Sequence, residues 1–417
     1  MIINTGVIKV ENKYFSVNDT LYEITDRYPE LIDLLANKGF EQLKDDEKRK
    51  AFGSKISLKQ ATMMKSLDLD KLVQLLITEL DNSAEQRDID NGDNDKKTLK
   101  ITGLLPCPVK MPLLEGIDQL ENEISSPIKR ELKSASQGLD WLKESIEDKP
   151  SAEKLSDLYI SAGFDLFFDR DLMDHYRRKD IFKDTTGLTD LNNDFVRNDI
   201  NLFDPEGDYS IIGVVPAVFL VNQEELAGRE APKTWADLLK PEFENSISLP
   251  VSDFDLFNAI LINIYKKYGT EGVEKLGRSM QKSLHPSEMV KEGGRKKQGE
   301  PAVTIMPYFF TRMAKRFPHM EFVWPEDGAI ISPIFMLIKE SSLPELQPVV
   351  DFFASKKVGS ILSEQGLFPS VRADIDNNLP ENSKFMWPGW DFLRENNPGE
   401  LIDELTDKFN QTAREAI

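Results

Sequence analysis

The residues of this chain that could do chemistry stand just after short apolar runs. They supply a thiol, an ammonium group, hydroxyls, a carboxylate and a glycine: Cys107, Lys110, Ser161, Gly163, Ser252, Asp253 and Tyr308. Open α/β sheets bind ligands beyond the carboxyl ends of their strands, so this placement predicts a small-molecule binding site. Backbone N–H groups at a helix start, with a lysine beside them, suit an anion. No nucleophile, base and orienting residue form a recognisable set, so we expect binding without catalysis.

The elements that must position these residues are predicted strands. Apolar runs over 99–105, 158–160, 247–249 and 302–306 predict four strands, and each precedes one or two of the candidate residues. The serine and aspartate after the third run suit a helix N-cap. The glycine after the second run permits a ligand to approach the backbone closely.

Further apolar runs indicate strands that connect two halves of a sheet. One covers 209–221, a second covers 321–324 and ends in Pro-Glu-Asp-Gly, and a third covers 329–338. Pro333 in the third run favours an edge or crossover strand over a central one. We interpret Glu326 and Asp327 as a turn, since Asp-Gly is a strong turn signal. Helical spacing predicts helices over 118–133, 256–268, 272–282, 344–365 and 396–417.

Composition excludes several classes of protein and site. The 417 residues include 52 basic and 72 acidic side chains, and the net charge of −20 disfavours nucleic acid and anionic membranes as partners. At roughly 150 residues per domain, the length indicates about three folding units. The single cysteine excludes an internal disulfide and cysteine-rich metal sites. No apolar run is long enough for a membrane span. We expect no cofactor.

The N-terminal part differs in pattern from the rest. Residues 1–80 indicate a small helical domain, in which Thr20 and Ser57 each begin a capping-box sequence. Residues 81–98 are polar and nearly free of apolar side chains, so we interpret them as a linker. The chain begins without a basic segment and apolar core of the signal-peptide kind, which predicts a cytoplasmic protein unless a leader has been removed.

Several segments of the second part resemble the bacterial extracellular solute-binding proteins. The run 212–222 is similar to the hinge strand of that family, and 232–241, with its Pro-Lys-Thr-Trp-Ala-Asp-Leu sequence, is similar to the helix that docks on it. The segment 323–328 resembles the return hinge. The segments 349–355 and 365–369 resemble the closing helices. The branch with the greatest resemblance is that of the ferric-iron and small-anion binders of ABC transporters.

This resemblance implies an α/β fold of the two-lobed type II periplasmic-binding kind over 99–417. One lobe would comprise about 99–212 and 329–417, and the other about 213–328, with the ligand held between them. The candidate residues named above would be its contacts, and an ABC permease its partner. Ferric binders use paired tyrosines, but Tyr265 and Tyr268 fall in an amphipathic helix and are predicted to pack. The ligand therefore stays open between an anion, a metal complex and a small organic molecule.

The N-terminal segment resembles a second family, a small helical domain of unknown function found beside hybrid-cluster and redox proteins of anaerobes. The resemblance rests on 20–29, 38–40 and 57–61. Many members of that family carry a Cys-x-x-Cys after the Gly-aromatic position, where this chain reads Glu-Gln-Leu-Lys over 41–44. Thiol–disulfide chemistry is therefore excluded there, and a docking or regulatory role remains.

Two other functions stay open at this point. A cytoplasmic sensor would bind a metabolite in the same place and signal to a protein partner through residues 16–80. An enzyme would use Cys107 as its nucleophile, and it would need a base within hydrogen-bond reach. We interpret the basic cluster of Lys291, Arg295, Lys296 and Lys297 as a solvated helix end or loop, and we assign no role to His285.

Overall fold

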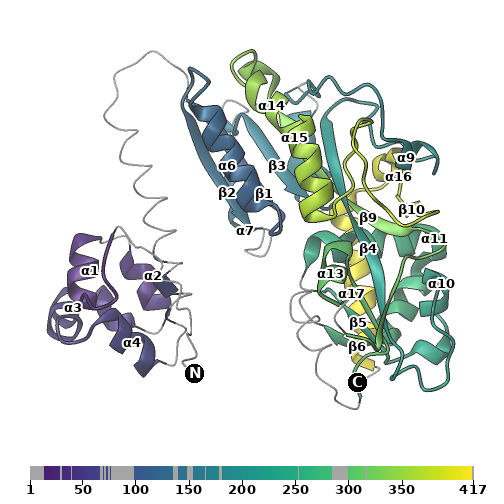
Figure 1. Cartoon of the computed structure of the whole chain (residues 1–417), viewed down its shortest axis with the longest axis horizontal. Coiled ribbons are helices and arrows are strands. Elements are labelled where there is room, and N and C mark those ends of the chain that lie inside the picture. The colour runs from purple at the N-terminus through teal and green to yellow at the C-terminus, as the bar shows by residue number, and fades with distance from the viewer. Residues whose placement is uncertain are drawn as a thin grey trace, which may run out of the picture. The chain divides into compact units, whose positions relative to one another are not determined.

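The computed structural model (Figure 1) divides into two compact units, Met1–Asp95 and Lys96–Ile417. The structure describes residues 14–28, 31–38, 40–65, 69, 72–73, 76, 98–134, 140–147, 154–164, 166–177, 181–251, 253–283, 299–314 and 317–415. The predicted linker, apart from its last residue, lies outside these ranges, as do Ser252, His285 and the basic cluster. No helix within the described residues is long and apolar enough to cross a membrane.

The first unit is helical in its described part, as the sequence predicts. It contains α1 Leu21–Arg27, α2 Leu31–Asn37, η1 Glu41–Lys44, α3 Asp46–Gly53 and α4 Leu58–Met64. Both capping boxes are confirmed, because Thr20 accepts from the backbone of Glu23 and Ser57 accepts from that of Gln60. The two caps also pair as a β-bridge, so the N-termini of α1 and α4 fix each other. Apolar side chains of these elements form one core around Leu21, Leu35 and Leu58, against which Phe52 of α3 packs.

The second unit is built on one mixed sheet. In the described residues its strands run in the order β2-β1-β3-β9-β4-β7-β5-β6, with β10 beside β9 and β8 beside β4. The strands are β1 Leu99–Leu105, β2 Ile128–Ser134, β3 Leu158–Ala162, β4 Tyr209–Asn222, β5 Ile247–Leu249, β6 Met280–Ser283, β7 Val303–Pro307, β8 Met320–Val323, β9 Ala329–Ile338 and β10 Phe385–Met386. The predicted strands over 99–105, 158–160, 209–221, 247–249 and 302–306 are confirmed with small shifts of their ends.

The helices of the second unit cover this sheet. They are α6 Lys110–Glu121, α7 Asp140–Glu147, η4 Leu166–Phe168, α8 Arg170–Arg177, α9 Asn193–Val196, α10 Trp235–Leu238, η5 Pro241–Phe243, α11 Phe254–Ser279, η6 Tyr308–Phe310, α13 Thr311–Ala314, η7 Glu340–Ser342, α14 Gln347–Phe353, α15 Lys356–Ser360, η8 Ile361–Gln365, α16 Trp390–Glu395 and α17 Pro398–Glu415. Helix α17 packs along α11.

The register of β9 places two groups of strand ends opposite each other. Strand β3 runs antiparallel to β9 and ends with Ala162 opposite Ile334. Strand β7 runs the other way and ends with Pro307 beside Ala217 of β4, which pairs with Ile330. Four residues of β9 separate these two levels, which corresponds to about 13 Å of strand. The carboxyl ends of β1 and β3 therefore point toward those of β5 and β7.

Strand β9 crosses from one group to the other. It lies between β3 and β4, so it is a central strand of the sheet as well as a crossover. Pro333 is tolerated there because the ladder with β3 ends at Ile334. The carbonyl of Pro333 then accepts the N–H of Gly163, and the missing donor faces the side where β3 has ended. Strand β9 continues β8 along the same side of β4 after the turn at 324–328.

Two helix predictions are wrong. Residues 118–133 were expected to form one helix, but α6 ends at Glu121 and β2 follows. Pro127 precedes β2, and the charged residues of this edge strand give it a polar pattern that hides its strand character. The helix expected over 344–365 is divided into three elements, because Ser355 caps a new helix through its bond to the Val358 N–H. The helices predicted over 256–268 and 272–282 form one element, α11, with a break between them at Gly269, whose φ is +66°.

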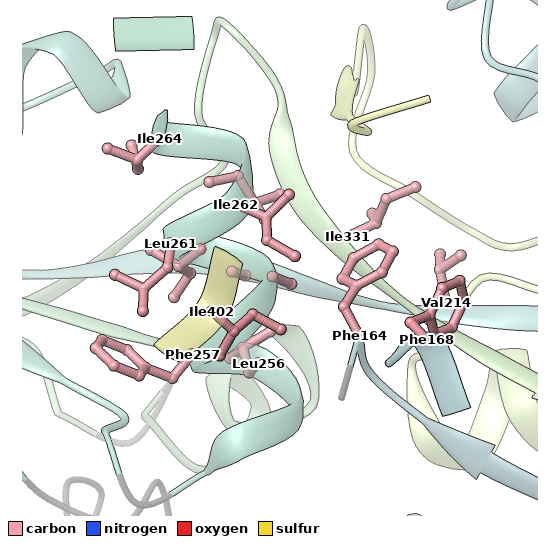
Figure 2. Close-up of a cluster of buried hydrophobic side chains, with 14 of the residues drawn as sticks. Phe164, Phe168, Val214, Leu256, Phe257, Leu261, Ile262, Ile264, Ile331 and Ile402 are labelled. Atoms are coloured by element: carbon pink, nitrogen blue, oxygen red, sulfur yellow. The ribbon is translucent and has the colours of Figure 1, made fainter. Parts of the chain in front are cut away.

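One hydrophobic cluster runs through the middle of the second unit. Figure 2 labels several of its members, among them Phe164 and Phe168 after β3, Leu256 and Phe257 in α11, and Ile402 in α17. These side chains are buried. The turn after β3 and the start of α11 therefore belong to one core although they lie in opposite groups of strand ends.

The hydrogen bonds at the N-terminal cap of α10 predict how the free energy of unfolding depends on pH. Burial alone would raise the pKa of Asp237, but hydrogen bonds from Lys240 and Thr234 outweigh it and lower this pKa to about 2. A depressed carboxyl pKa stabilises the fold above the unfolded value of about 4, and this contribution is lost as the pH falls toward 2. We expect Asp237→Asn to lower the free energy of unfolding at neutral pH, with a deficit that shrinks below pH ~4. Urea unfolding across pH, with Asp403→Asn as the charge-matched control, measures it; a deficit constant with pH would contradict it.

Candidate functional site

The turn after β1 combines a lysine with an uncapped helix start. Lys110 is the first residue of α6, and its N-cap residue, Val109, makes no side-chain cap bond. Lys110 is half-buried and Cys107 is exposed. Helix N-termini attract negative charge because their first N–H groups lack partners within the helix. The anion contact predicted from the sequence is compatible with this turn and stays a prediction. Cys107 does not have the buried environment of a packing thiol.

The turn after β3 lies against the first turn of α11. Ser161 lies inside β3 and is fully buried, and its Oγ has no hydrogen-bond partner among the described residues. Gly163 has φ +98°, and a Cβ added there would lie 2.9 Å from the Cα of Asp255. The backbone segment that closely approaches Gly163 is the first turn of α11, and the predicted approach of a ligand stays a prediction. The hydroxyl of Ser332 on β9 also donates to the Asp255 carbonyl, at 3.1 Å.

Asp253 occupies the N-cap position of α11. It is half-buried, and its side chain makes no cap bond to the helix backbone. With Asp255 in the first turn, two carboxylates stand at this helix start. Carboxylates accept hydrogen bonds from hydroxyl and ammonium groups, so this helix start differs in charge from the turn at Lys110.

Tyr308 begins η6, directly after the end of β7. Its ring lies 5.5 Å from that of Phe322 and 5.2 Å from that of Trp324, measured between centroids. Burial raises the pKa of Tyr308, and the positive charge of Arg312 opposes this rise. The phenol is therefore protonated at neutral pH and is a hydrogen-bond donor.

The two groups of strand ends touch at a second place that the sequence did not indicate. The guanidinium group of Arg312, on α13, donates to the carbonyls of Glu364 at 2.5 Å and Gln365 at 3.2 Å. Phe309 packs against the hydrophobic cluster that contains Val109. A contact between residues some 50 positions apart leaves no local pattern, so only the folded chain reveals it.

A family model for bacterial extracellular solute-binding proteins matches residues 153–396, more than half of the chain. The chain belongs to this family. A second model, for a domain of unknown function (DUF1858), matches residues 15–73. Both resemblances drawn from the sequence are thereby confirmed. No match was found among curated proteins.

Solved structures agree with the fold of this solute-binding protein. An ABC transporter protein from Clostridium perfringens has a TM-score of 0.53 at 17% identity, covering 76% of this chain and 99% of that one. Iron-bound HitA from Pseudomonas aeruginosa has a TM-score of 0.51 at 14% identity, with coverage of 76% and 99%. AfuA from Actinobacillus pleuropneumoniae, with fructose-6-phosphate bound, has a TM-score of 0.53 at 13% identity, with coverage of 75% and 99%. At these identities the likeness shows the fold alone, and it confirms the type II periplasmic-binding architecture.

The paired tyrosines of the solute-binding protein pack as expected. Tyr265 and Tyr268 both lie against the large hydrophobic cluster. The hydroxyl of Tyr268 donates to Asp327 at 3.1 Å. Burial raises the pKa of Tyr268, and the negative charge of Asp327 raises it further. Asp327 also accepts from Lys267 and from the Trp235 backbone N–H. The Gly328 N–H donates to the Pro325 carbonyl at 3.0 Å, so the turn predicted at Glu326 and Asp327 is confirmed.

A groove of about 350 Å³ lies between α6 and the segment formed by α15 and η8. Its walls are residues of α6, α15 and η8: Pro112, Glu115, Gly116, Gln119, Lys357, Ser360, Ile361, Glu364 and Gln365. Lys357 donates to Gln119 across it, at 2.8 Å. Within the described residues, no group of three or more histidines, cysteines, aspartates and glutamates is placed to hold a metal ion.

Proposed function

We propose that this solute-binding protein holds a small organic anion between two lobes and does no chemistry on it. The observation that carries the proposal is the uncapped start of α6 with Lys110 in its first turn, at strand ends that point toward those of the other group. The proposed contacts are those expected from the sequence: Cys107, Lys110, Ser161, Gly163, Ser252, Asp253 and Tyr308.

The charges of the site favour a solute with two different ends. An anionic head suits Lys110 and the N–H groups of α6. Tyr308, a protonated phenol, supplies a further donor. The carboxylates of Asp253 and Asp255 suit hydroxyl or amino groups on the body of the solute. A phosphorylated or carboxylated polyol has both ends, and the fructose-6-phosphate bound by AfuA is of that kind.

The lobes of this proposal follow the sheet. The first comprises about 99–212 with 329–397, and the second about 213–328. The sequence alone grouped the whole of 329–417 with the first lobe, but the packing of α17 along α11 supports placing residues 398–415 with the second. Strands β4 and β9 connect the lobes, so a hinge in their middle would let the strand ends close on a solute.

The family description supports action outside the cytoplasm, where the protein would deliver its solute to an ABC permease. Residues 16–80 would then dock a second protein or regulate delivery. Native mass spectra of freshly purified protein, recorded before and after denaturation, test the central claim. A released organic anion would support it. Release of a bare metal ion, or of an uncharged molecule, would contradict the proposed class of solute.

Lys110→Ala tests the assignment of the anionic end. Loss of one hydrogen bond to a charged group costs about 1.5–3 kcal/mol, so we expect affinity for the released anion to fall about tenfold or more. Lys129→Ala, an exposed lysine on the edge strand β2, is the charge-matched control and should bind as the wild type does. Isothermal titration with the recovered solute measures both. Equal affinity of the two variants would contradict the assignment.

A further inference from the structure

Arg312 joins the two halves of the second unit. It lies on α13, just after Tyr308, and both carbonyls that it binds belong to the end of η8 in the first lobe. Thr311 ties this segment together, because its hydroxyl donates to the Tyr308 carbonyl at 2.7 Å. The guanidinium group is thus coupled through one short, bonded segment to a proposed solute contact.

The end of η8 is suited to hold a guanidinium group. The last carbonyls of a helix have no partner within it and carry partial negative charge. A guanidinium group presents donors in a planar fork that can reach two neighbouring carbonyls. The same end of η8 packs on the start of α6, since a Cβ added to Gly366 would lie 2.8 Å from Cγ1 of Val109. The contact therefore connects Tyr308 to the helix start that bears Lys110.

We propose that Arg312 is an interlobe latch, which holds the lobes together and sets how much of the solute-free protein is closed. The proposal rests on the two lobes described above, but it can be tested without a solute. A protein whose closed form is already populated loses less free energy to closure when it binds. Removal of the latch shifts the population toward the open form and lowers the apparent affinity for any solute held between the lobes.

Hydrogen exchange of the full-length, solute-free protein tests the latch. The amides to follow lie at the other interlobe contact, in the turn at Gly163 and in the first turn of α11, where the Phe257 N–H is bonded to the Asp253 carbonyl. We expect Arg312→Ala to speed exchange there about three- to tenfold, the effect of losing exposed charged hydrogen bonds. Arg278→Ala is the control, because Arg278 pairs with Glu244 inside the second lobe at 3.6 Å.

The pattern of exchange distinguishes a latch from a local cap. Faster exchange at both interlobe contacts in Arg312→Ala, and unchanged exchange there in Arg278→Ala, supports the latch. Faster exchange confined to the end of η8 would overturn it, as would no change anywhere. Arg312→Lys should lie between the wild type and the alanine variant, since an ammonium group keeps the charge but loses the planar fork. None of these outcomes depends on the class of solute, so a failure of the latch is separate from a failure of the proposed function.

Discussion

Gly163→Ala is expected to remove most of the solute affinity and to lower the stability of the second unit by about 1–3 kcal/mol. Two causes act together. The φ of +98° is one that residues with a Cβ rarely adopt. The added Cβ would also lie 2.9 Å from the Cα of Asp255, a backbone atom that cannot rotate away. Relief of this clash must move the turn after β3 away from α11, and that movement opens the proposed site.

A substitution at a second glycine distinguishes the effect of backbone strain from that of the clash with Asp255. Gly228 has a φ of +87°, similar to that of Gly163, but a Cβ added there would meet nothing within 4 Å. Gly228→Ala should therefore lose stability through strain alone and retain solute. All five tryptophans, Trp141, Trp235, Trp324, Trp387 and Trp390, lie in the second unit, so their fluorescence during urea unfolding reports on that unit. Equal solute affinity and stability in the two variants would show that the approach to Asp255 has no role.

The sheet was predictable where each strand carries its own pattern. Strand β4 is long and almost wholly apolar, and the runs of β5 and β7 end at prolines or turn signals, so local rules sufficed. Strand β2 was not predicted, because an edge strand needs little apolar surface and carries charged residues that prevent pairing with other chains. Its pairing with β1 decides its conformation, and that pairing is a tertiary property that its own residues do not encode.

The site was predictable as a set of positions but not as a set of contacts. Strand ends indicate where Lys110, Gly163 and Tyr308 stand, because the carboxyl ends of strands in such sheets converge. What the Gly163 backbone approaches is decided by the packing of α11 on β9, and its neighbour Asp255 is about 90 residues away. The contact of Arg312 with η8 is of the same kind. Contacts between segments that are distant in the sequence depend on the assembled sheet, so no local sequence pattern predicts them.

Trp235→Ala is expected to cost about 3–5 kcal/mol, the largest loss of stability that we expect from any one side chain of the second lobe. Trp235 is fully buried, and its ring packs edge-on against Phe219 of β4 with centroids 4.9 Å apart. Its indole N–H donates to the Gly328 carbonyl at 2.9 Å. The side chain therefore holds the turn between β8 and β9 against β4. Without the Trp235 side chain, we expect β9 to lose its fixed path after the turn as well as its packing.

The phenylalanine variants separate the hydrogen bond from the packing. Trp235→Phe keeps an aromatic ring but leaves the buried carbonyl of Gly328 without its donor, which costs about 1–3 kcal/mol. Trp324→Phe is the matched control, because the Trp324 indole also donates to a carbonyl, that of Lys384 at 2.7 Å. The Trp324 side chain is half-buried, but this bond is exposed, so water can replace the donor. Urea unfolding followed by circular dichroism compares the two. If Trp235→Phe loses no more stability than Trp324→Phe, the bond to Gly328 does not hold the turn, and the path of β9 must depend on the Asp327 contacts instead.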